Sequence, residues 1–429
     1  MTIRHALAVA LLVSGGPPAS AADLDALPIR YATAETDNAV TRLERQHKAK
    51  TAELKADDEF GYLKSLLAAL DIPASSQVLV FSKTSLQRSR IGPKTPRAIY
   101  FNDDIAVGFC RTGEVLEVAA SDPNLGTVFY TLDQRPDRAP RFTRQTETCL
   151  ICHGSSASQG FPGHLIRSVS PDMHGELVLS RGTKRVDHST PFEDRWGGWY
   201  VTGTSGKQEH MGNQVVGGWP WAEKGAQPAG ENVVDLKPYF TAANYLTPHS
   251  DLVALMVLEH QGEMQNRLTR ANFQTRQALH EQAELNKAFG DPPATRNESI
   301  TKRIHWACES VVKYLLFCEE VKLTEPVAGT SGFAKEFAAR GPSDAKKRSL
   351  REFDLKTRMF KYPLSYLIYS KPFDGLPAEA KARVYLRLWE VLTGKDTSKD
   401  FEHLSKDDRR AVLEILRDTK PGLPAYWKN

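Results

Sequence analysis

The hydrophobic positions between residues 77 and 132 fall into short runs that turn residues separate. The runs are QVLVFS, RAIYFN, IAVGFC, EVLEVA and TVFYTL, and the breaks include Asn102-Asp103, Thr112-Gly113 and Asp122-Pro123. Short β-type runs joined by tight turns are typical of antiparallel sheet. GELVLSRG and RWGGWYVTG predict two more strands further along the chain.

From Ser250 onward the hydrophobic period becomes helical. One stripe recurs every four residues: Leu252, Met256, His260, Met264 and Leu268. This spacing predicts a helix with Ser250 as N-cap that reaches Phe289, and Pro292 and Pro293 would end it. Further helices are predicted at 298–321, 377–393 and 405–418.

The predicted fold class is therefore α+β. An antiparallel, β-rich N-terminal half would span residues 22–249, and a mainly α-helical half would span residues 250–429.

The first 21 residues are predicted to be a secretory signal peptide that is cut after Ala21. They hold Arg4, an apolar run over residues 6–13, a Gly/Pro break, and small residues before the cut. The run is far shorter than the roughly 20 residues that cross a bilayer. We expect an exported protein, periplasmic in a Gram-negative source, with no membrane span in the mature chain.

Composition is that of a globular protein, with 41% hydrophobic and 25% charged residues among 429. The formal net charge of +4 is small for this length, which argues against a nucleic-acid partner. Two local basic stretches, KAKTAELK and DAKKRSLR, are most simply solvated faces.

The segment TETCLICHGSS, residues 146–156, carries the clearest chemical signal. Cys149, Cys152 and His153 have the C-x-x-C-H spacing of haem attachment, in which two thiols bind the vinyl groups and the imidazole binds the iron. A zinc site would need a second pair of ligands at similar spacing. A redox dithiol would be expected at the start of a helix in an α/β unit, whereas this pair follows an antiparallel pattern.

The other three cysteines are predicted to be buried thiols. Cys110 ends an alternating run, and Cys308 and Cys318 lie ten residues apart in a helical pattern. On one helix those two would be roughly 15 Å apart, beyond the roughly 7 Å limit for a disulfide.

In the pentapeptide at 149–153 the chain resembles the c-type cytochromes. The resemblance implies one covalent haem, with Cys149 and Cys152 as thioether anchors and His153 as proximal iron ligand. It departs from a small cytochrome c domain, which is essentially helical, because the flanking segments look like sheet. The chain is also similar to large exported single-haem proteins, in the phrases RWGGWYVTGTSG, HMGN and YPLSYLIYS.

The ligand at the sixth coordination position of such an iron decides between the possible functions. A methionine or histidine there makes an electron carrier, and an open position lets the iron bind small molecules. Met211, 58 residues after His153, is the main candidate. The alternatives are the neighbouring His210, His260 on the predicted helix, Met173 with His174, or an open site.

Several polar and aromatic residues are candidates for the surroundings of a haem. Arg167, and with it His164, would hydrogen-bond a haem propionate. The segment DHSTPFEDRWGGWY gathers His188, Asp194, Arg195, Trp196 and Trp199, either as walls of a haem cleft or as strand core. Asp187 would orient His188 for acid/base work.

The sequence thus predicts a periplasmic single-haem electron carrier that docks a redox partner protein. The alternatives are a haem oxidoreductase acting on peroxide or a small nitrogen or sulfur compound, with His164, His188 or Arg195 assisting proton transfer, and a gas sensor with an open site.

Overall fold

The computed structural model describes residues 24–135, 139–220 and 230–428. The predicted signal peptide, residues 1–21, lies outside these ranges.

The N-terminal half is built on a seven-stranded sheet with the order β6-β5-β4-β3-β2-β1-β9, in which every neighbouring pair is antiparallel. The strands are β1 (Val78–Val80), β2 (Arg97–Phe101), β3 (Ile105–Phe109), β4 (Val115–Asp122), β5 (Gly126–Asp133), β6 (Phe142–Gln145) and β9 (Trp199–Tyr200). The five runs predicted between residues 77 and 132 are thus confirmed as β1 to β5.

The two faces of this sheet pack against different partners. Side chains alternate across a strand, so Leu79 joins the core beneath α1 (Ala39–Lys48) and α2 (Leu63–Ala69), while Val78 and Val80 join the core of the helical half. The second face therefore supports the long helix α4 (Leu252–Phe289) over part of its area.

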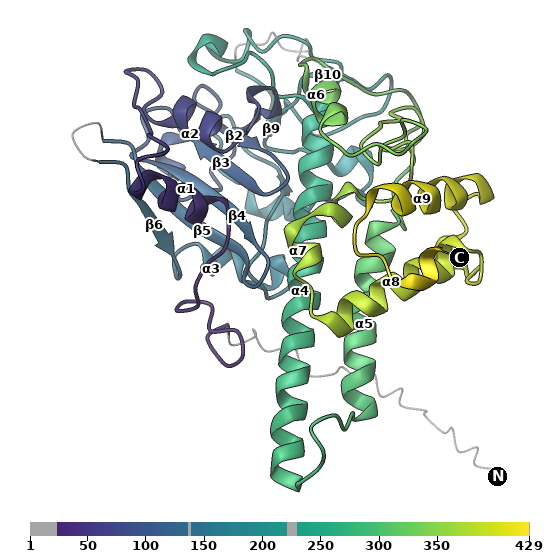
Figure 1. Cartoon of the computed structure of the whole chain (residues 1–429). Coiled ribbons are helices and arrows are strands. Elements are labelled where there is room, and N and C mark those ends of the chain that lie inside the picture. The colour runs from purple at the N-terminus through teal and green to yellow at the C-terminus, as the bar shows by residue number, and fades with distance from the viewer. Residues whose placement is uncertain (1–23, 136–138, 221–229, 429) are drawn as a thin grey trace, which may run out of the picture.

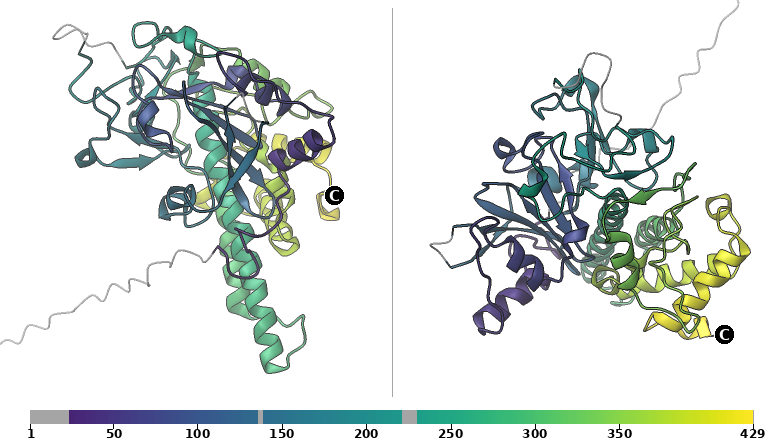
Figure 2. Two further views of the ribbon diagram at one scale, coloured as in Figure 1. Left: turned by 90° about the vertical axis from the view of Figure 1, so that its left-hand side faces the viewer. Right: turned by 90° about the horizontal axis from the view of Figure 1, so that it is seen from above.

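The C-terminal half is mainly helical, as predicted. Besides α4 it contains α5 (Glu298–Leu315), α6 (Phe333–Ala339), α7 (Lys371–Asp374), α8 (Ala378–Leu392) and α9 (Lys406–Thr419). Figure 2 shows α4 and α5 running together and extending beyond the sheet as a hairpin. The predicted stripe from Leu252 to Leu268 is buried along its whole length.

Two predicted helix ends were wrong. Asp251, not Ser250, caps α4, because its carboxylate accepts from the backbone N–H groups of Val253 and Ala254. Ser250 instead donates to the Tyr200 carbonyl and accepts from the Leu79 N–H, which joins two sheet strands. α5 ends at Leu315 rather than 321, since the chain turns through positive φ at Phe317 and again at Glu319.

The predicted strand GELVLSRG was also wrong. Leu179 is 82% exposed in a short 3-10 turn, and Gly182 turns the chain at a φ of +75°. Within this segment Leu177 forms an isolated antiparallel bridge with Pro171, and the ladder begins afterwards, where β8 (Thr183–Arg185) runs antiparallel to β7 (Arg167–Val169).

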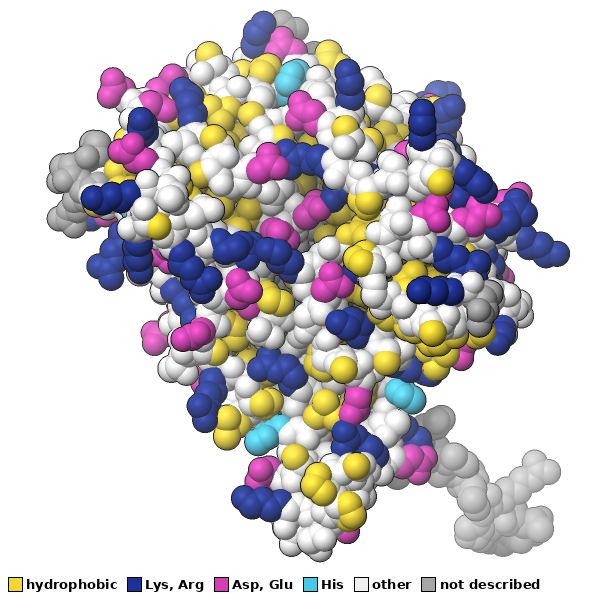
Figure 3. All heavy atoms as spheres, in the orientation of Figure 1, with side chains coloured by type: hydrophobic (Ala, Val, Ile, Leu, Met, Phe, Trp, Pro, Cys, Tyr) yellow, Lys and Arg dark blue, Asp and Glu magenta, His cyan; other side chains and the backbone are white. Residues whose placement is uncertain are grey.

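The two halves are joined by strand pairing as well as by packing. β10 (Gly203–Thr204) pairs with β11 (Ala328–Gly329), which belongs to the helical half. Within the described parts of the chain, no helix is long and apolar enough to cross a membrane. On the face in Figure 3, acidic and basic side chains are interspersed, in keeping with the small net charge.

A buried histidine pair lies in the core between α4 and the segment after β8. The Nδ1 atoms of His188 and His260 are 2.9 Å apart, and His188 stacks on Tyr314 with ring centroids 4.0 Å apart. Burial lowers the pKa of both imidazoles well below the ordinary value, and Arg195 adds to this at His188. Both rings are therefore neutral in the folded protein at neutral pH.

This pair predicts a loss of stability in acid. Below the pKa of about 6.5 that histidine has in the unfolded chain, the unfolded state binds protons at these two positions and the folded state does not. The free energy of unfolding then falls by up to about 1.4 kcal/mol per histidine for each pH unit. We expect the free energy of unfolding to fall between pH 7 and pH 5, and to fall less steeply in the His188→Phe variant. Urea denaturation at each pH measures both slopes, with the exposed His174→Gln as control. Equal slopes in wild type and His188→Phe would contradict the prediction.

Candidate haem-attachment site

The C-x-x-C-H residues lie on a single helical turn, α3 (Leu150–His153), with Cys149 at its N-terminal cap and Gly154 after its end. The His153 N–H donates to the Cys149 carbonyl over 2.9 Å, which closes the turn. Residues three and four apart share one helix face, so the turn brings the three predicted residues together. Both cysteines are free thiols; Cys149 is half-buried and Cys152 is exposed.

The His153 ring is oriented by a backbone carbonyl. Its Nδ1 lies 2.9 Å from the Gly163 oxygen, and its ring packs against Phe129 of β5 with centroids 4.7 Å apart. A carbonyl only accepts, so Nδ1 carries the proton and the neutral ring keeps its lone pair on Nε2. Burial lowers the pKa of His153, with contributions from Arg97 and Arg167, and this favours the neutral form.

The loop after α3 folds back onto the motif. The Ser158 hydroxyl lies 2.8 Å from the His153 carbonyl and 2.9 Å from the Phe161 carbonyl, and the Gly163 N–H donates to the His153 carbonyl over 2.9 Å. These bonds fix Gly163, the residue whose own carbonyl orients the imidazole.

A charged pair spans the sheet beside the motif. Arg97 of β2 and Glu117 of β4 form an ion pair of 2.7 Å, and their side chains are only 19% and 15% exposed. The pair crosses β3 at Gly108, where a Cβ atom would lie 2.3 Å from the Arg97 guanidinium. A side chain at position 108 would therefore displace the Arg97 guanidinium from its present position.

This pair acts on the motif electrostatically. Burial raises the pKa of the Cys149 thiol to about 11, with the Glu117 carboxylate adding to the rise and Arg97 opposing it. The same two charges act in opposite directions on the pKa of His153. The motif thus sits within reach of two arginines and one carboxylate.

These residues fit a covalently bound haem. Cys149 and Cys152 offer two free thiols on one turn, and His153 offers a neutral imidazole with an unprotonated Nε2. Arg97 has a buried Nε atom that makes no hydrogen bond in the described chain, and such a group suits an anionic propionate. Arg167, predicted for the same role, is also close enough to act on His153.

Met211 lies against a different part of the fold. The Ser168 hydroxyl is 3.5 Å from its sulfur, and its backbone N–H donates to the Arg195 carbonyl over 3.0 Å. Neither contact is with a residue of the motif, and ligation of the iron by Met211 stays a prediction.

The other candidates for the sixth position have the following surroundings in the structure. His260 bonds through both ring nitrogens, to His188 and, over 2.8 Å, to the Ser365 hydroxyl. His210 accepts from the Gly212 N–H through Nδ1 over 3.1 Å. Met173 is 44% exposed in the turn that it shares with His174.

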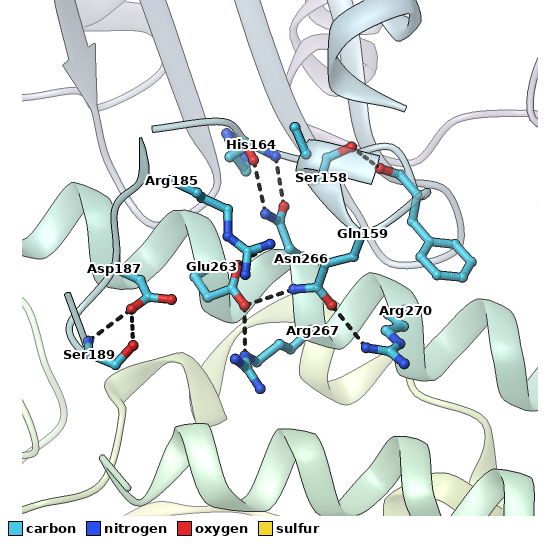
Figure 4. Close-up of polar contacts among 12 residues, drawn as sticks. Ser158, Gln159, His164, Arg185, Asp187, Ser189, Glu263, Asn266, Arg267 and Arg270 are labelled. Atoms are coloured by element: carbon cyan, nitrogen blue, oxygen red, sulfur yellow. Dashed lines mark hydrogen bonds and ion pairs between the residues drawn. The ribbon is translucent and has the colours of Figure 1, made fainter. Parts of the chain in front are cut away.

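The aromatic residues of segment 187–200 lie in the core, together with Arg195 and His188. Arg195 forms a buried ion pair with Glu259, and the Trp196 indole donates to the same carboxylate over 3.0 Å. The Trp199 indole donates to the Arg167 carbonyl over 2.8 Å. The Asp187 carboxylate accepts from the N–H and the hydroxyl of Ser189, as Figure 4 shows. The hydrogen bond of the His188 ring is instead with His260. These residues hold β7 and α4 in place.

Two hollows on the molecule are separate from this site. The larger, of about 610 Å³, is lined by residues 240–248 with Lys94 and Lys237, and the smaller, of about 10 Å³, lies between Phe101 and Phe337. Neither is lined by a residue of the motif, so the chemistry of the thiols and imidazole, not the hollows, identifies the candidate site.

Sequence reasoning missed Arg97, Glu117 and Phe129. Each is an ordinary strand residue in sequence, and only the register of β2, β4 and β5 places them on the face toward the motif. The alternation of side chains was the one available signal. It predicts which residues share a face of the sheet, but not which segment packs on that face.

No family model, curated protein or solved structure matches this chain. The functional conclusion therefore depends on the geometry of the site and on the residues that form it.

Proposed function

We propose that the protein is an exported c-type cytochrome with one haem, held by thioether bonds to Cys149 and Cys152 and ligated through His153. The observation that carries this is the hydrogen bond from His153 Nδ1 to the Gly163 carbonyl, which leaves Nε2 as a free ligand next to two free thiols. Metal-ligating histidines generally make such a bond with the second ring nitrogen.

A haem bound there supplies an iron that gains or loses one electron. The chain's own residues set the surroundings. His153 donates a lone pair, Arg97 and Arg167 offer positive charge for the propionates, and Phe129 supports the imidazole ring. Glu117 keeps a negative charge close to the motif.

Electron transfer to a periplasmic redox partner is the activity that this site supports best. The motif is at the surface, since Ile151 is 76% exposed and Cys152 is exposed beside it. An edge of the haem near these residues would be reachable by a partner protein. The two hollows lie elsewhere, so they provide no substrate cavity at the motif.

Removing the thiols should abolish covalent attachment. We expect that the full-length precursor, matured in a host with haem-attachment machinery, carries haem that stays on the polypeptide after denaturation. Haem retention should fall in Cys149→Ser and in Cys152→Ser and vanish in the double variant, because each thioether needs its own sulfur. The Cys308→Ala variant, changed at a buried thiol of α5, is the matched control. Covalent haem in the double variant would contradict the proposal.

The occupant of the sixth position is tested by the visible spectrum of Met211→Ala. We expect this variant to change from low-spin to high-spin and to gain affinity for carbon monoxide, because loss of the sulfur leaves the sixth position open. A spectrum that keeps the wild-type form with and without the gas would contradict ligation by Met211.

A further inference from the structure

One peptide group links the ligand His153 to the helical half of the protein. The Gly163 carbonyl accepts from His153 Nδ1, and the N–H of the same peptide unit, which belongs to His164, donates to Asn266 Oδ1 over 2.7 Å. Asn266 Nδ2 also donates to the His164 carbonyl over 2.9 Å. Figure 4 shows the Asn266 amide facing His164 from α4.

The close approach of Asn266 explains the glycine at 163. A Cβ atom on residue 163 would lie 2.2 Å from Asn266 Oδ1 and 2.9 Å from its Cγ, well inside contact distance. Asn266 itself is 3% exposed, so its amide cannot turn to water and depends on these two bonds.

We propose that Asn266 is a positioning residue for the iron ligand. By holding the His164 N–H, it fixes the plane of the Gly163–His164 peptide, and that plane decides where the carbonyl meets His153 Nδ1. Hydrogen bonds in such a chain polarise one another. The carbonyl therefore becomes a stronger acceptor, and the imidazole a stronger electron donor through Nε2.

A second contact one turn earlier on α4 holds the same loop. Glu263 accepts from the Gln159 side chain over 2.7 Å and from the Arg267 guanidinium over 2.8 Å. The Arg270 guanidinium donates to Gln159 Oε1 over 3.3 Å, as Figure 4 shows. The loop between α3 and β7 is thus held at two points by one buried helix.

Asn272 provides a matched control on the same helix. It is also 3% exposed, and its Nδ2 also donates to backbone carbonyls, those of Pro123 and Gly375, at 3.0 and 3.1 Å. Neither carbonyl belongs to the loop or the motif, so Asn272→Ala removes an equivalent buried amide without touching His153.

The first test uses the apoprotein and nitrogen-15 NMR of the histidine rings. We expect His153 in the wild type to carry its proton on Nδ1, and the ratio of the Nδ1–H to the Nε2–H tautomer to fall at least about threefold in Asn266→Ala. Asn272→Ala should leave the ratio unchanged. Asn266→Leu keeps the size of the side chain and removes the acceptor for the His164 N–H, so it should show the same fall and provides the test if Asn266→Ala does not fold.

The second test uses the haem-loaded protein and rests on the proposed function. The midpoint potential should shift positively in Asn266→Ala, because a weaker donor stabilises ferric iron less, and should stay at the wild-type value in Asn272→Ala. If the chain takes up no haem, the proposed function fails while the tautomer measurement still stands. If haem is bound but tautomer and potential match the wild type in Asn266→Ala, the role of Asn266 is overturned.

Discussion

The hydrogen bond from His153 Nδ1 to the Gly163 carbonyl is the interaction on which the site depends. An imidazole binds iron only when it is neutral and presents an unprotonated nitrogen. The bond holds the proton on Nδ1 and so leaves Nε2 unprotonated. Burial of the ring lowers the pKa of His153 and keeps it neutral, although the bond to the Gly163 carbonyl raises that pKa. The bond requires that the loop after α3 return to place the Gly163 carbonyl beside the ring. The Ser158 hydroxyl and the Gly163 N–H hold the loop there by hydrogen bonds to the His153 carbonyl.

The architecture around this bond involves both halves of the chain. One face of the sheet is covered by α1 and α2, and the other is shared between α4 and the motif. α4 carries the core stripe on one side and, through Asn266 and Glu263, holds the motif loop on another. The helical half is therefore part of the support of the site as well as a partner in the core.

Much of the fold could be predicted from the sequence, because strands and helices follow from the periodicity of the hydrophobic residues. The β1 to β5 strands and the stripe from Leu252 to Leu268 follow from alternation and from four-residue spacing. Predictions failed where a single side chain decides between two roles. Ser250 and Asp251 are both good caps, and only the position of Tyr200 and Leu79 assigns Ser250 to the sheet.

Of the candidate site, only the C-x-x-C-H residues could be predicted from the sequence. Cys149, Cys152 and His153 are adjacent in sequence and share a helical turn, so their spacing is enough to bring them together. Arg97, Glu117 and Asn266 come from three elements separated by up to 169 residues, and tertiary packing alone brings them to the motif.

The proposed covalent attachment of a haem to Cys149 and Cys152 is tested most directly on the protein after haem maturation. The measurement is extraction with an acidic organic solvent, followed by mass analysis of the polypeptide and of the peptide that contains residues 149–153. Thioether attachment predicts that the mass of one haem stays with the chain and maps to this peptide. Haem that leaves with the solvent, or a matured chain with two free thiols and no haem, would contradict it.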